Sequence, residues 1–538
     1  MIPVSNFSRT PARRQCAIAT PHVLATEAAC EAIRSGGNAI DAALTAAFVL
    51  SVVYPHNTSL GGDLIALVRE PDGTITTVNA SGPASRHVDL ADFQSRFGNS
   101  MPVTGVNSIT VPGAIAGLAT LHSFGASRAW EEHLGAAYDL AATGAPVAPS
   151  LEAATKEQFE LVRRDPGLAA LLAPTGEPLR TGERLVQPAL AQSLRTLASE
   201  GPASFYGGQL GRDLIGGLSA LGAQLDSSDL EAFAPLIEKP LQAKYGPWDI
   251  WTSGPNSQGF LLLEVLGALE SLGPTRDPLG RDAGVLSELF RMATNDRDTY
   301  LAEPGLMKKS VAELLDPTRL AALGVEARRR TSTTPTSAGH ENRRPKGDTV
   351  AVVTADADGR AVCLIQSVFH AFGAAVLETS TGIVMHNRGS LFSLDSDSAN
   401  QLAPRRRPAH TLMPVMVTRE SELAWVAGTM GGKAQPQILA QILLRLFAGE
   451  TPHDAVAAPR WVIGGLEANH VEERAYVESP IATGARQSIE TRLAIVDLPQ
   501  HDEITGHSQV VGVLDDGRLV AASDPRSDGS GAVVEVTK

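Results

Sequence analysis

The residue in this chain with the clearest chemical potential is Thr349, which follows Gly347 and Asp348 where a polar tract meets a strand-like run. If the chain were cut before Thr349, this residue would carry a hydroxyl and a free α-amino group together. The hydroxyl could then serve as a nucleophile, and the amine as the base that takes its proton. An α-amino group has an unperturbed pKa of about 7.7–8.0, so a useful fraction is unprotonated at neutral pH. Such a cut would make this an enzyme that matures by cleaving its own chain.

Two expected elements flank this threonine, one before it in the chain and one after it. Residues 325–348 are basic and polar, and we expect them to form a disordered tract. After this tract, residues 350–353 and 361–365 are apolar and flank a turn at residues 356–359, which is the pattern of a β-hairpin. The plainer interpretation of the same residues is an interdomain linker, followed by a β-branched residue that begins a strand.

Further helices and strands are expected on both sides of the junction. The Gly36-Gly37 pair ends one helix, and Asn38 caps the next helix with Asp41 as its capping-box partner. A second hairpin is expected from residues 64–68 and 74–78. Other expected elements are a helical region over 113–323, strands over 382–386 and 414–418, and a helix over 437–446.

Composition and charge narrow the function classes. The chain has 538 residues, 43% apolar and 19% charged, so it can bury a large core and is not a coiled coil, a collagen or a disordered chain. A net charge of −14 argues against non-specific binding to nucleic acid or to an anionic membrane. The first residues contain no apolar signal region, and the longest apolar run, near residues 42–54, is too short to span a bilayer. We therefore expect a cytoplasmic protein.

The sequence contains no recognisable metal or cofactor motif. The cysteines lack the spacing of a metal site or a disulfide framework, which fits thiols in a reducing compartment. No phosphate-cradling glycine loop follows a strand. The histidines are scattered without ligand spacing, among them His56, His370, His386 and His410. We expect neither a metal nor a cofactor.

Several separate motifs occur in an order that resembles one known family. A lone glycine pair is usually a turn, but the ordered set of motifs is specific. On these residues the chain resembles, over nearly its whole length, the γ-glutamyltranspeptidase-like branch of the N-terminal nucleophile (Ntn) hydrolases. The motifs are GGNAIDAA at 36–43, YPH at 54–56, LGG at 60–62, VPG at 111–113, DRDTY at 296–300, GDT at 347–349, GI at 382–383 with Asn387, RP at 407–408, GG at 431–432 and ASDPR at 522–526.

The resemblance implies a fold and a maturation route. The fold would be α+β, as a four-layer αββα Ntn-hydrolase sandwich with two stacked antiparallel sheets. Self-cleavage would give a large subunit of residues 1–348 and a small subunit of residues 349–538. The two would remain together as a heterodimer, and the sequence leaves open whether two heterodimers pair further.

The resemblance also implies catalytic residues. Thr349 would be the nucleophile, and the backbone N–H groups of Gly431 and Gly432 would form an oxyanion hole, although an ordinary turn that leads into a helix fits the glycines too. Each such donor typically contributes a factor of about 10²–10³ to the rate. Ser367 stands where the family usually has a threonine whose hydroxyl contacts the amino group of the nucleophile. Ser367 would lie on the return strand of the hairpin, close to Thr349.

Three positions depart from the pattern of enzymes that bind a γ-glutamyl group. Ala80 stands where those enzymes have an arginine for the α-carboxylate, and Leu391 where they have an acidic residue for the α-amino group. A paired serine motif is replaced by Ala409-His410-Thr411. Leaving a substrate charge desolvated and without a partner costs several kcal/mol, so these changes argue against γ-glutamyl specificity.

Other side chains are expected to bind the substrate instead. Arg388 and Lys433 are cations beside positions that the family uses for substrate, and each could face either the pocket or the solvent. If either cation points inward, the pocket should prefer an acyl group that bears a carboxylate and no ammonium. The full set of expected substrate-binding residues is Asn387, Arg388, His410, Thr411 and Lys433.

The early Asn-Ala-Ser-Gly and the late Asn-Arg-Gly patterns resemble the cytoplasmic oxamate-amidohydrolase-like subgroup. We therefore predict hydrolysis of a small amide whose acyl part carries a carboxylate, oxamate-like or glutaryl-like, through an acyl-enzyme on Thr349. One alternative is a γ-glutamyltransferase or glutathione hydrolase with a rearranged pocket, and another is an unprocessed, inactive scaffold. A basic arm that binds nucleic acid is disfavoured, because the tract has no interleaved aromatic residues and the chain is acidic.

Overall fold

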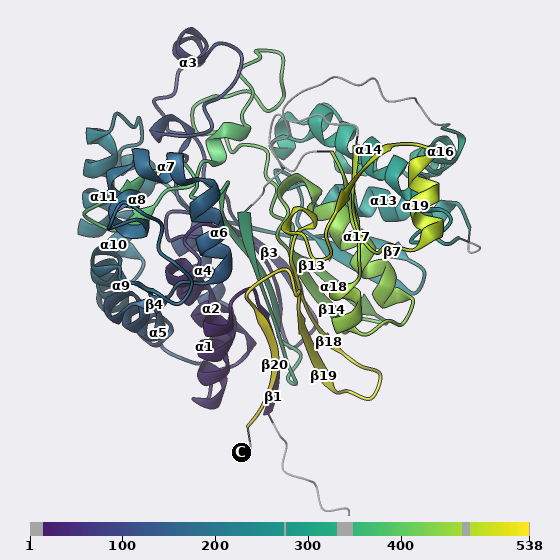
Figure 1. The fold of residues 1–538 in the computed structure, drawn as a ribbon, viewed down its shortest axis with the longest axis horizontal. Coiled ribbons are helices and arrows are strands. Elements are labelled where there is room, and N and C mark those ends of the chain that lie inside the picture. The colour runs from purple at the N-terminus through teal and green to yellow at the C-terminus, as the bar shows by residue number, and fades with distance from the viewer. Residues whose placement is uncertain (1–13, 274–275, 331–347, 465–473, 537–538) are drawn as a thin grey trace, which may run out of the picture.

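The computed structural model describes residues 14–273, 276–330, 348–464 and 474–536. Two sheets run through the middle of the molecule, and helices lie on their outer sides (Figure 1). The expected α+β class, with antiparallel sheets, is confirmed.

The strand that carries Thr349 lies in the middle of a seven-stranded antiparallel sheet, in the order β20-β1-β9-β10-β2-β3-β6. Strands β9 (Asp348–Asp356) and β10 (Ala361–Phe369) are buried along their whole length. Because both faces of this sheet are covered, these strands are continuous apolar runs rather than alternating ones. The other strands are β1 (Arg14–Thr20), β2 (Asp63–Arg69), β3 (Ile75–Ala80), β6 (Leu236–Glu238) and β20 (Ser530–Val536).

A six-stranded antiparallel sheet packs face to face against the first. Apolar side chains from both sheets form one core cluster, which joins Ala351 and Ile365 to Met416 and Val426. Gly428 comes so near the first sheet that an added Cβ would lie 2.9 Å from Ala351 Cβ. The order is β19-β18-β14-β13-β8-β7, with β7 (Leu241–Tyr245), β8 (Trp248–Thr252), β13 (Val415–Arg419), β14 (Glu422–Thr429), β18 (Ser508–Val513) and β19 (Leu519–Ser523).

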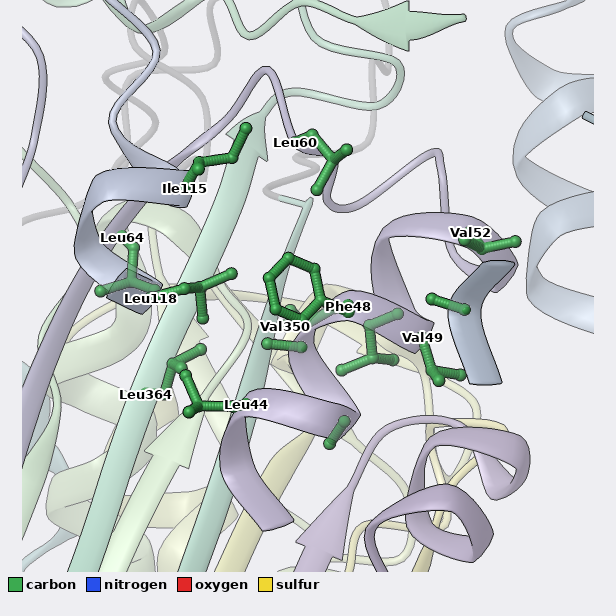
Figure 2. Close-up of a cluster of buried hydrophobic side chains, with 14 of the residues drawn as sticks. Leu44, Phe48, Val49, Val52, Leu60, Leu64, Ile115, Leu118, Val350 and Leu364 are labelled. Atoms are coloured by element: carbon green, nitrogen blue, oxygen red, sulfur yellow. The ribbon is translucent and has the colours of Figure 1, made fainter. Parts of the chain in front are cut away.

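Helices cover the outer face of the first sheet. Helix α2 (Ala39–Val53) is buried at every position, as expected for a helix that is apolar all round. Its Leu44 and Phe48 belong to the same core cluster as Val350 and Leu364 of the sheet (Figure 2). The neighbouring long helices are α1 (Val23–Arg34), α4 (Ala114–Ser123), α5 (Trp130–Thr143), α9 (Pro188–Glu200) and α11 (Gln209–Ala220).

A second group of helices packs on the outer face of the six-stranded sheet and shares a core cluster with it. These helices are α13 (Phe260–Ser271), α14 (Ala283–Tyr300), α16 (Pro317–Arg329), α17 (Gln435–Phe447), α18 (Pro452–Ala457) and α19 (Thr483–Glu490). A small sheet of β15 (Trp461–Ile463), β16 (Arg474–Glu478) and β17 (Ala494–Leu498) lies beside them. Shorter elements are α3 (Leu90–Phe97), α6 (Pro149–Glu157), α7 (Phe159–Arg164), α8 (Pro166–Leu172), α10 (Ala203–Tyr206), α12 (Ser227–Glu231), α15 (Val311–Leu314), β4 (Ala145–Pro146), β5 (Arg184–Leu185), β11 (Leu377–Glu378) and β12 (Ile383–Val384).

Local signals in the sequence predicted several elements correctly. Asn38 caps α2 with Asp41 as its capping-box partner. The hairpins β2–β3 and β9–β10 both pair as expected. Strand β13 and helix α17 confirm the elements expected over 414–418 and 437–446.

Two expectations are wrong. Residues 325–329 are helical within α16, where a Glu326–Arg329 ion pair and basic residues in the last turn favour the helix. Asp348 pairs with Phe369 in the sheet, so the predicted disordered tract 325–348 is ordered at both ends; its residues 331–347 lie outside the described residues. The region expected to be helical also contains the short strands β6, β7 and β8, which are edge or near-edge strands of the two sheets.

Two further observations concern the described residues alone. None of their helices is both long enough and apolar enough to cross a membrane. They also contain no group of three or more His, Cys, Asp or Glu side chains that could hold a metal ion. The cytoplasmic location and the lack of a metal stay predictions.

Candidate active site

Thr349 is the second residue of β9 and is only 1% exposed, so it does not stand at the start of a solvent-exposed strand. The pairing of β9 with β10 shifts at this point, because Val350 pairs with Gln366 whereas Asp348 pairs with Phe369. Two residues of β10 therefore lie opposite Thr349 alone, which is a β-bulge. Such bulges commonly re-aim side chains beside active sites.

The bulge places Ser367 in contact with the predicted nucleophile. Thr349 Oγ1 donates to Ser367 Oγ at 3.1 Å, and Ser367 Oγ donates to the carbonyl oxygen of Asp348 at 2.7 Å. The backbone N–H of Phe369 also donates to Ser367 Oγ, at 2.7 Å. A hydroxyl has one proton and two acceptor lone pairs, so these contacts use its full capacity. In the continuous chain, Ser367 thus polarises the carbonyl of the bond that would be cut.

The predicted oxyanion loop, Met430 to Lys433, follows β14 and approaches the same place. Met430 and Asp348 line one hollow. Gly431 has a φ of 138° and Gly432 a φ of 51°, a backbone geometry that favours glycine. Met430, at the start of this loop, and Asp348 therefore lie around the same small space.

Backbone contacts fix the oxyanion loop and leave two donors available. Met430 N donates to His507 O at 2.9 Å, and Gln258 Nε2 donates to Gly432 O at 2.8 Å. Arg297 Nη1 donates to the carbonyl oxygen of Lys433 at 3.2 Å. Within the described ranges, the N–H groups of Gly431 and Gly432 have no acceptor. Two neighbouring, preorganised N–H groups are what an oxyanion hole needs.

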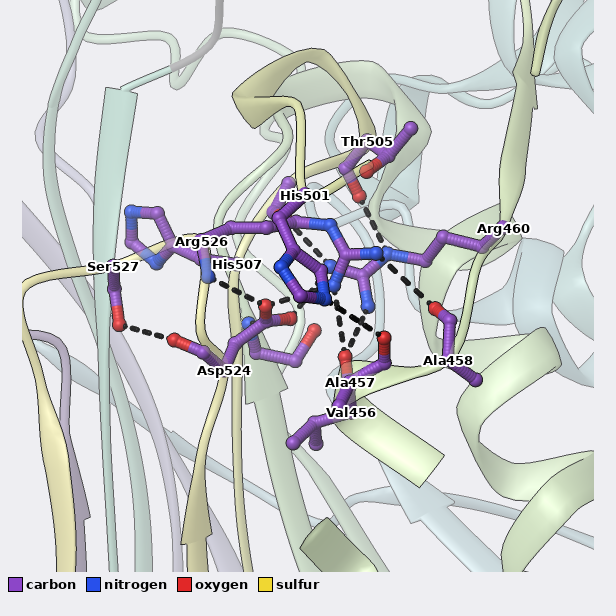
Figure 3. Close-up of polar contacts among 12 residues, drawn as sticks. Val456, Ala457, Ala458, Arg460, His501, Thr505, His507, Asp524, Arg526 and Ser527 are labelled. Carbon is purple, nitrogen blue, oxygen red and sulfur yellow. Dashed lines mark hydrogen bonds and ion pairs between the residues drawn. The ribbon is translucent and has the colours of Figure 1, made fainter. Parts of the chain in front are cut away.

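Buried ions support the segment on which this loop rests (Figure 3). Arg460 Nη2 contacts Asp524 at 2.6 Å, and Arg526 contacts both Asp524 and Glu478. Arg460 also donates to the carbonyl oxygens of Thr505 and Gly506, at 2.9 and 2.6 Å. Gly506 lies directly against the oxyanion loop, since an added Cβ would come 2.4 Å from Met430 O.

Arg388 is fully buried and does not face solvent. Its Nε and Nη2 atoms donate to the two oxygens of Asp63, at 2.9 and 3.2 Å, and its Nη1 atom donates to Thr411 Oγ1 at 2.9 Å. The guanidinium also lies 4.3 Å from the centroid of the Phe369 ring. Asp63 pairs with Ser367 across β2 and β10, so Arg388 is held next to the bulge.

Asp63 anchors a compact polar cluster. His410 Nε2 lies 2.8 Å and His386 Nδ1 3.3 Å from Asp63 Oδ2. Burial alone would raise the pKa of Asp63, but the charge of Arg388 and the contact with His410 hold it well below its usual range. Burial and the nearby Arg388 lower the pKa of His410 to about 4, so its ring is neutral at physiological pH. The cluster therefore contains the Arg388–Asp63 ion pair with the neutral ring of His410 beside it.

Lys433 and Asn387 have different environments. The Lys433 side chain is 12% exposed, with Nζ 3.9 Å from Asp298. Burial and the charge of Arg297 lower its pKa to about 8, although Asp298 acts in the opposite direction. The Asn387 amide accepts from His370 N at 3.2 Å and donates to Val103 O at 2.7 Å. The Asn387 side chain thus forms hydrogen bonds to the backbone of neighbouring segments.

Among the predicted residues, contacts join Thr349 to Ser367, and Arg388 to Thr411. The structure adds three residues that the sequence did not single out. Gln258 Nε2 donates to Thr411 O as well as to Gly432 O, both at 2.8 Å, and so joins the Arg388 side to the oxyanion loop. Asp63 directly follows the LGG motif at 60–62, which was a signal of its position. His386 precedes Asn387, and no ligand spacing in the sequence distinguishes it from the other histidines.

Comparisons with known proteins place the chain in a family. The chain matches the family model described as Gamma-glutamyltranspeptidase over residues 25–534. It is 33% identical over 525 residues to the glutathione hydrolase-like YwrD proenzyme of Bacillus subtilis (strain 168), covering 95% of this chain and 97% of the relative. It is also 33% identical over 528 residues to the oxamate amidohydrolase proenzyme of Klebsiella pneumoniae, with the same coverage. A solved cephalosporin acylase from Bacillus halodurans superposes with a TM-score of 0.86 at 28% identity, covering 99% of this chain and 98% of that one.

The contacts of Ser367 predict an effect on self-cleavage. Ser367→Ala removes the donor to the Asp348 carbonyl and should slow cleavage before Thr349 by about 10²–10³-fold, the usual contribution of one oxyanion donor. Ser367→Thr keeps the hydroxyl and should cleave within a few fold of the wild type. Denaturing gels over a time course would measure both rates. Wild-type cleavage in Ser367→Ala would contradict the role of this hydroxyl.

The contact between Gly506 and Met430 predicts an effect on turnover. Gly506→Ala should push the oxyanion loop away and lower kcat for amide hydrolysis by about 10²-fold with little change in KM, since small misplacements near reacting groups are costly. Gly517→Ala is the matched control: the φ of Gly506 is 75° and that of Gly517 is 80°, but nothing lies within 4 Å of a Cβ at Gly517. An equal loss of kcat in both variants would show that backbone strain, not loop displacement, is responsible.

Proposed function

Because this chain belongs to the gamma-glutamyltranspeptidase family, we propose that it is an Ntn hydrolase that cuts itself before Thr349 and then cleaves a small amide. The names of its relatives describe a glutathione hydrolase-like protein, an oxamate amidohydrolase and a cephalosporin acylase, which supports amide hydrolysis. The observation that carries the proposal is the Ser367 hydroxyl, which bonds both to Thr349 and to the carbonyl of the bond to be cut. Two facing sheets with helices outside support the four-layer αββα sandwich.

Self-cleavage must begin without an amine, because the nitrogen of Thr349 is an amide in the precursor. Thr349 Oγ1 attacks the carbonyl carbon of Asp348, while Ser367 Oγ donates to the oxygen on which negative charge develops. The C–N bond breaks as the hydroxyl proton passes to nitrogen, so the acyl group moves from N to O. Water then hydrolyses the ester, which frees the Thr349 hydroxyl and leaves Asp348 with a terminal carboxylate. The products are subunits 1–348 and 349–538, which stay together as a heterodimer.

Amide hydrolysis then uses the new amine. The α-amino group of Thr349 takes the hydroxyl proton as Oγ1 attacks the substrate carbonyl. The N–H groups of Gly431 and Gly432 bind the oxyanion. The C–N bond breaks, and the leaving amine takes a proton from the α-ammonium group. Water attacks the resulting ester and gives its proton to the same amine. The acid is released and Oγ1 regains its proton.

The substrate we propose carries a carboxylate on its acyl part, as oxamate and glutaryl amides do. Arg388 uses three of its five N–H groups on Asp63 and Thr411, and the described residues occupy no others, so two remain for a ligand. Lys433 supplies a second buried cation beside Gly432. Ala80 and Leu391 offer no charge to a γ-glutamyl group. We therefore propose that an acyl carboxylate binds the two remaining N–H groups of Arg388 or the ammonium group of Lys433.

A γ-glutamyltransferase or glutathione hydrolase is the alternative, favoured by the name of one relative, which describes a glutathione hydrolase-like protein. Turnover of γ-glutamyl-p-nitroanilide, compared with oxalyl- and glutaryl-p-nitroanilide, separates the two functions because only the acyl group differs. Rapid turnover of the γ-glutamyl compound alone would favour the alternative. An uncut chain that turns over none of them would indicate an inactive scaffold.

The nucleophile assignment predicts a specific pair of masses. The purified wild-type protein should give two polypeptides, one of which begins at Thr349. Thr349→Ala should remain one chain and hydrolyse no amide, because it has neither the hydroxyl nor the amine. Thr349→Ser keeps both groups and should still be cut. Intact-mass spectrometry measures all three, and an uncut wild type with full amidase activity would refute the assignment.

The pKa of Lys433 predicts a pH dependence that is specific to charged substrates. Since this pKa is about 8, Lys433 is charged below pH 8 and neutral above it. The KM for a glutaryl amide should therefore rise as pH increases through about 8. A butyryl amide of the same amine should show no such rise in KM. Dividing the KM of the glutaryl amide by that of the butyryl amide at each pH cancels any effect of the titration of the Thr349 amine, which both substrates share. Lys433→Arg should keep a low KM for the glutaryl amide to higher pH, and an unchanged profile in Lys433→Arg would contradict the assignment.

A further inference from the structure

Thr429 is the last residue of β14 and directly precedes the oxyanion loop. Its side chain is fully buried. Thr429 Oγ1 donates to the carbonyl oxygen of Met430 at 2.7 Å and, at the longer distance of 3.1 Å, to that of His507. Ser508 Oγ donates to Thr429 Oγ1 at 2.7 Å. Because the Thr429 oxygen already has a donor, its own proton is directed at the two carbonyls, of which that of Met430 is the nearer.

This hydrogen bond fixes the direction of an N–H group that the proposed mechanism uses. The carbonyl group of Met430 and the N–H group of Gly431 belong to one planar trans peptide unit, so they point in opposite directions. Holding the oxygen of this unit therefore also holds its N–H. This N–H is one of the two donors that we assign to the oxyanion.

Without such a bond, little would orient this peptide unit. Gly431 has a φ of 138°, and a glycine has no Cβ to restrict rotation about that bond. The bond from Met430 N to His507 O fixes only the preceding peptide unit. Gly506 lies against the Met430 oxygen, but its own N–H donates to Glu503 O at 2.8 Å. Thr429 thus supplies the hydrogen bond that orients the unit.

The second oxyanion donor is oriented without a side chain. The N–H of Gly432 shares its peptide unit with the carbonyl of Gly431, which accepts from Ala434 N at 2.9 Å. This bond lies within the turn that leads into the short 3₁₀ helix η4 (Gly432–Ala434). The loop therefore orients one of its donors itself and relies on Thr429 for the other.

Buried charges hold the residue that donates to Thr429. Ser508 is fully buried, and its backbone N–H donates to Asp524 Oδ2 at 3.0 Å. The same carboxylate oxygen contacts Arg460 Nη2 at 2.6 Å, in the ion cluster of Figure 3. Ser508 is thus fixed from behind, and the Thr429 hydroxyl keeps one orientation.

We propose that Thr429 is a positioning residue, whose hydroxyl holds the Gly431 N–H in the direction that an oxyanion requires. The inference rests on the proposed function, in which this N–H binds the oxyanion of the substrate. Preorganised donors stabilise the transition state because they need not reorient as charge develops. A loose peptide unit should therefore lower kcat, and it should change KM little because the substrate carbonyl carries little charge before the reaction.

The proposal separates turnover from self-cleavage. In the precursor, negative charge develops on the carbonyl oxygen of Asp348, which accepts from Ser367 Oγ. Thr429 makes no contact with that carbonyl, so its hydroxyl should matter for substrate turnover and not for the cut. A residue that only stabilises the fold would affect both rates.

Three variants test this role. Thr429→Val keeps the shape of the side chain and removes the hydroxyl, whereas Thr429→Ser keeps the hydroxyl. Thr354→Val is the matched control, because Thr354 is also fully buried in a strand and its Oγ1 also donates to a backbone carbonyl, that of Ala39, at 2.7 Å. Denaturing gels over a time course give the rate of self-cleavage. The cleaved proteins then give kcat and KM for the γ-glutamyl-, oxalyl- or glutaryl-p-nitroanilide that the wild type turns over fastest.

We expect Thr429→Val to cut itself at the wild-type rate and to have a kcat about tenfold lower with an unchanged KM, the effect of losing one hydrogen bond. Thr429→Ser should restore kcat, and Thr354→Val should match the wild type in both rates. If Thr429→Val does not fold, Ser508→Ala removes only the donor to Thr429 and should lower kcat by a few fold.

Several results would overturn the role of Thr429. They are a wild-type kcat in Thr429→Val or, where that variant does not fold, in Ser508→Ala; an equal loss of kcat in Thr354→Val; a loss that Thr429→Ser does not restore; and a parallel slowing of self-cleavage. Each of these leaves the proposed function intact. A wild type that stays uncut, or that turns over no amide, would instead refute the proposed function and this inference with it.

Discussion

The site depends on one hydroxyl group, Ser367 Oγ, which contacts the nucleophile, the carbonyl before it and the backbone after the bulge. The extra residue in β10 brings the N–H of Phe369 back to this oxygen, at the cost of a φ of 81° at Phe369. Once both lone pairs have donors, the hydroxyl proton is directed at the Asp348 carbonyl. Strain at one residue thus orients a hydrogen bond toward the peptide that self-cleavage would break.

The charges buried around this hydroxyl lie beside counter-ions. A buried ion pair is weak evidence for stability, because desolvation offsets most of the attraction. The pairs here are better explained by the loops that they hold. Asp63 fixes the fork of Arg388 next to Phe369, and Arg460 fixes the backbone of Gly506 against Met430. Removing either acid, Asp63 or Asp524, would leave a guanidinium group buried without its charge partner.

Local patterns were readable from the sequence, and contacts between distant segments were not. The Asn38 cap and the two hairpins each depend on residues a few positions apart. The role of Asp63 depends on β2 pairing with β10. The pattern of apolar residues does not show which residues of these two strands lie opposite each other. The strands β6, β7 and β8 are short and partly exposed, so they lack the apolar run that marked β9. Gln258 matters only because two loops meet at its amide.

The order of the sheet explains how one cut could create the site without rebuilding the fold. Within the sheet, the strands lie side by side in the order β1-β9-β10-β2. The strands β9 and β10, which follow the proposed cut in the chain, therefore lie between two strands that precede it, and β20 pairs with β1. Cleavage before Thr349 would free only the Asp348–Phe369 pair at the end of the β9–β10 ladder, since the residues after Thr349 keep their partners. The contact between Thr349 and Ser367 would therefore survive, while the carbonyl of Asp348 is free to leave Ser367 Oγ. The new amine would replace that carbonyl beside the same hydroxyl, so one serine could serve both the cutting of the chain and the enzyme that results.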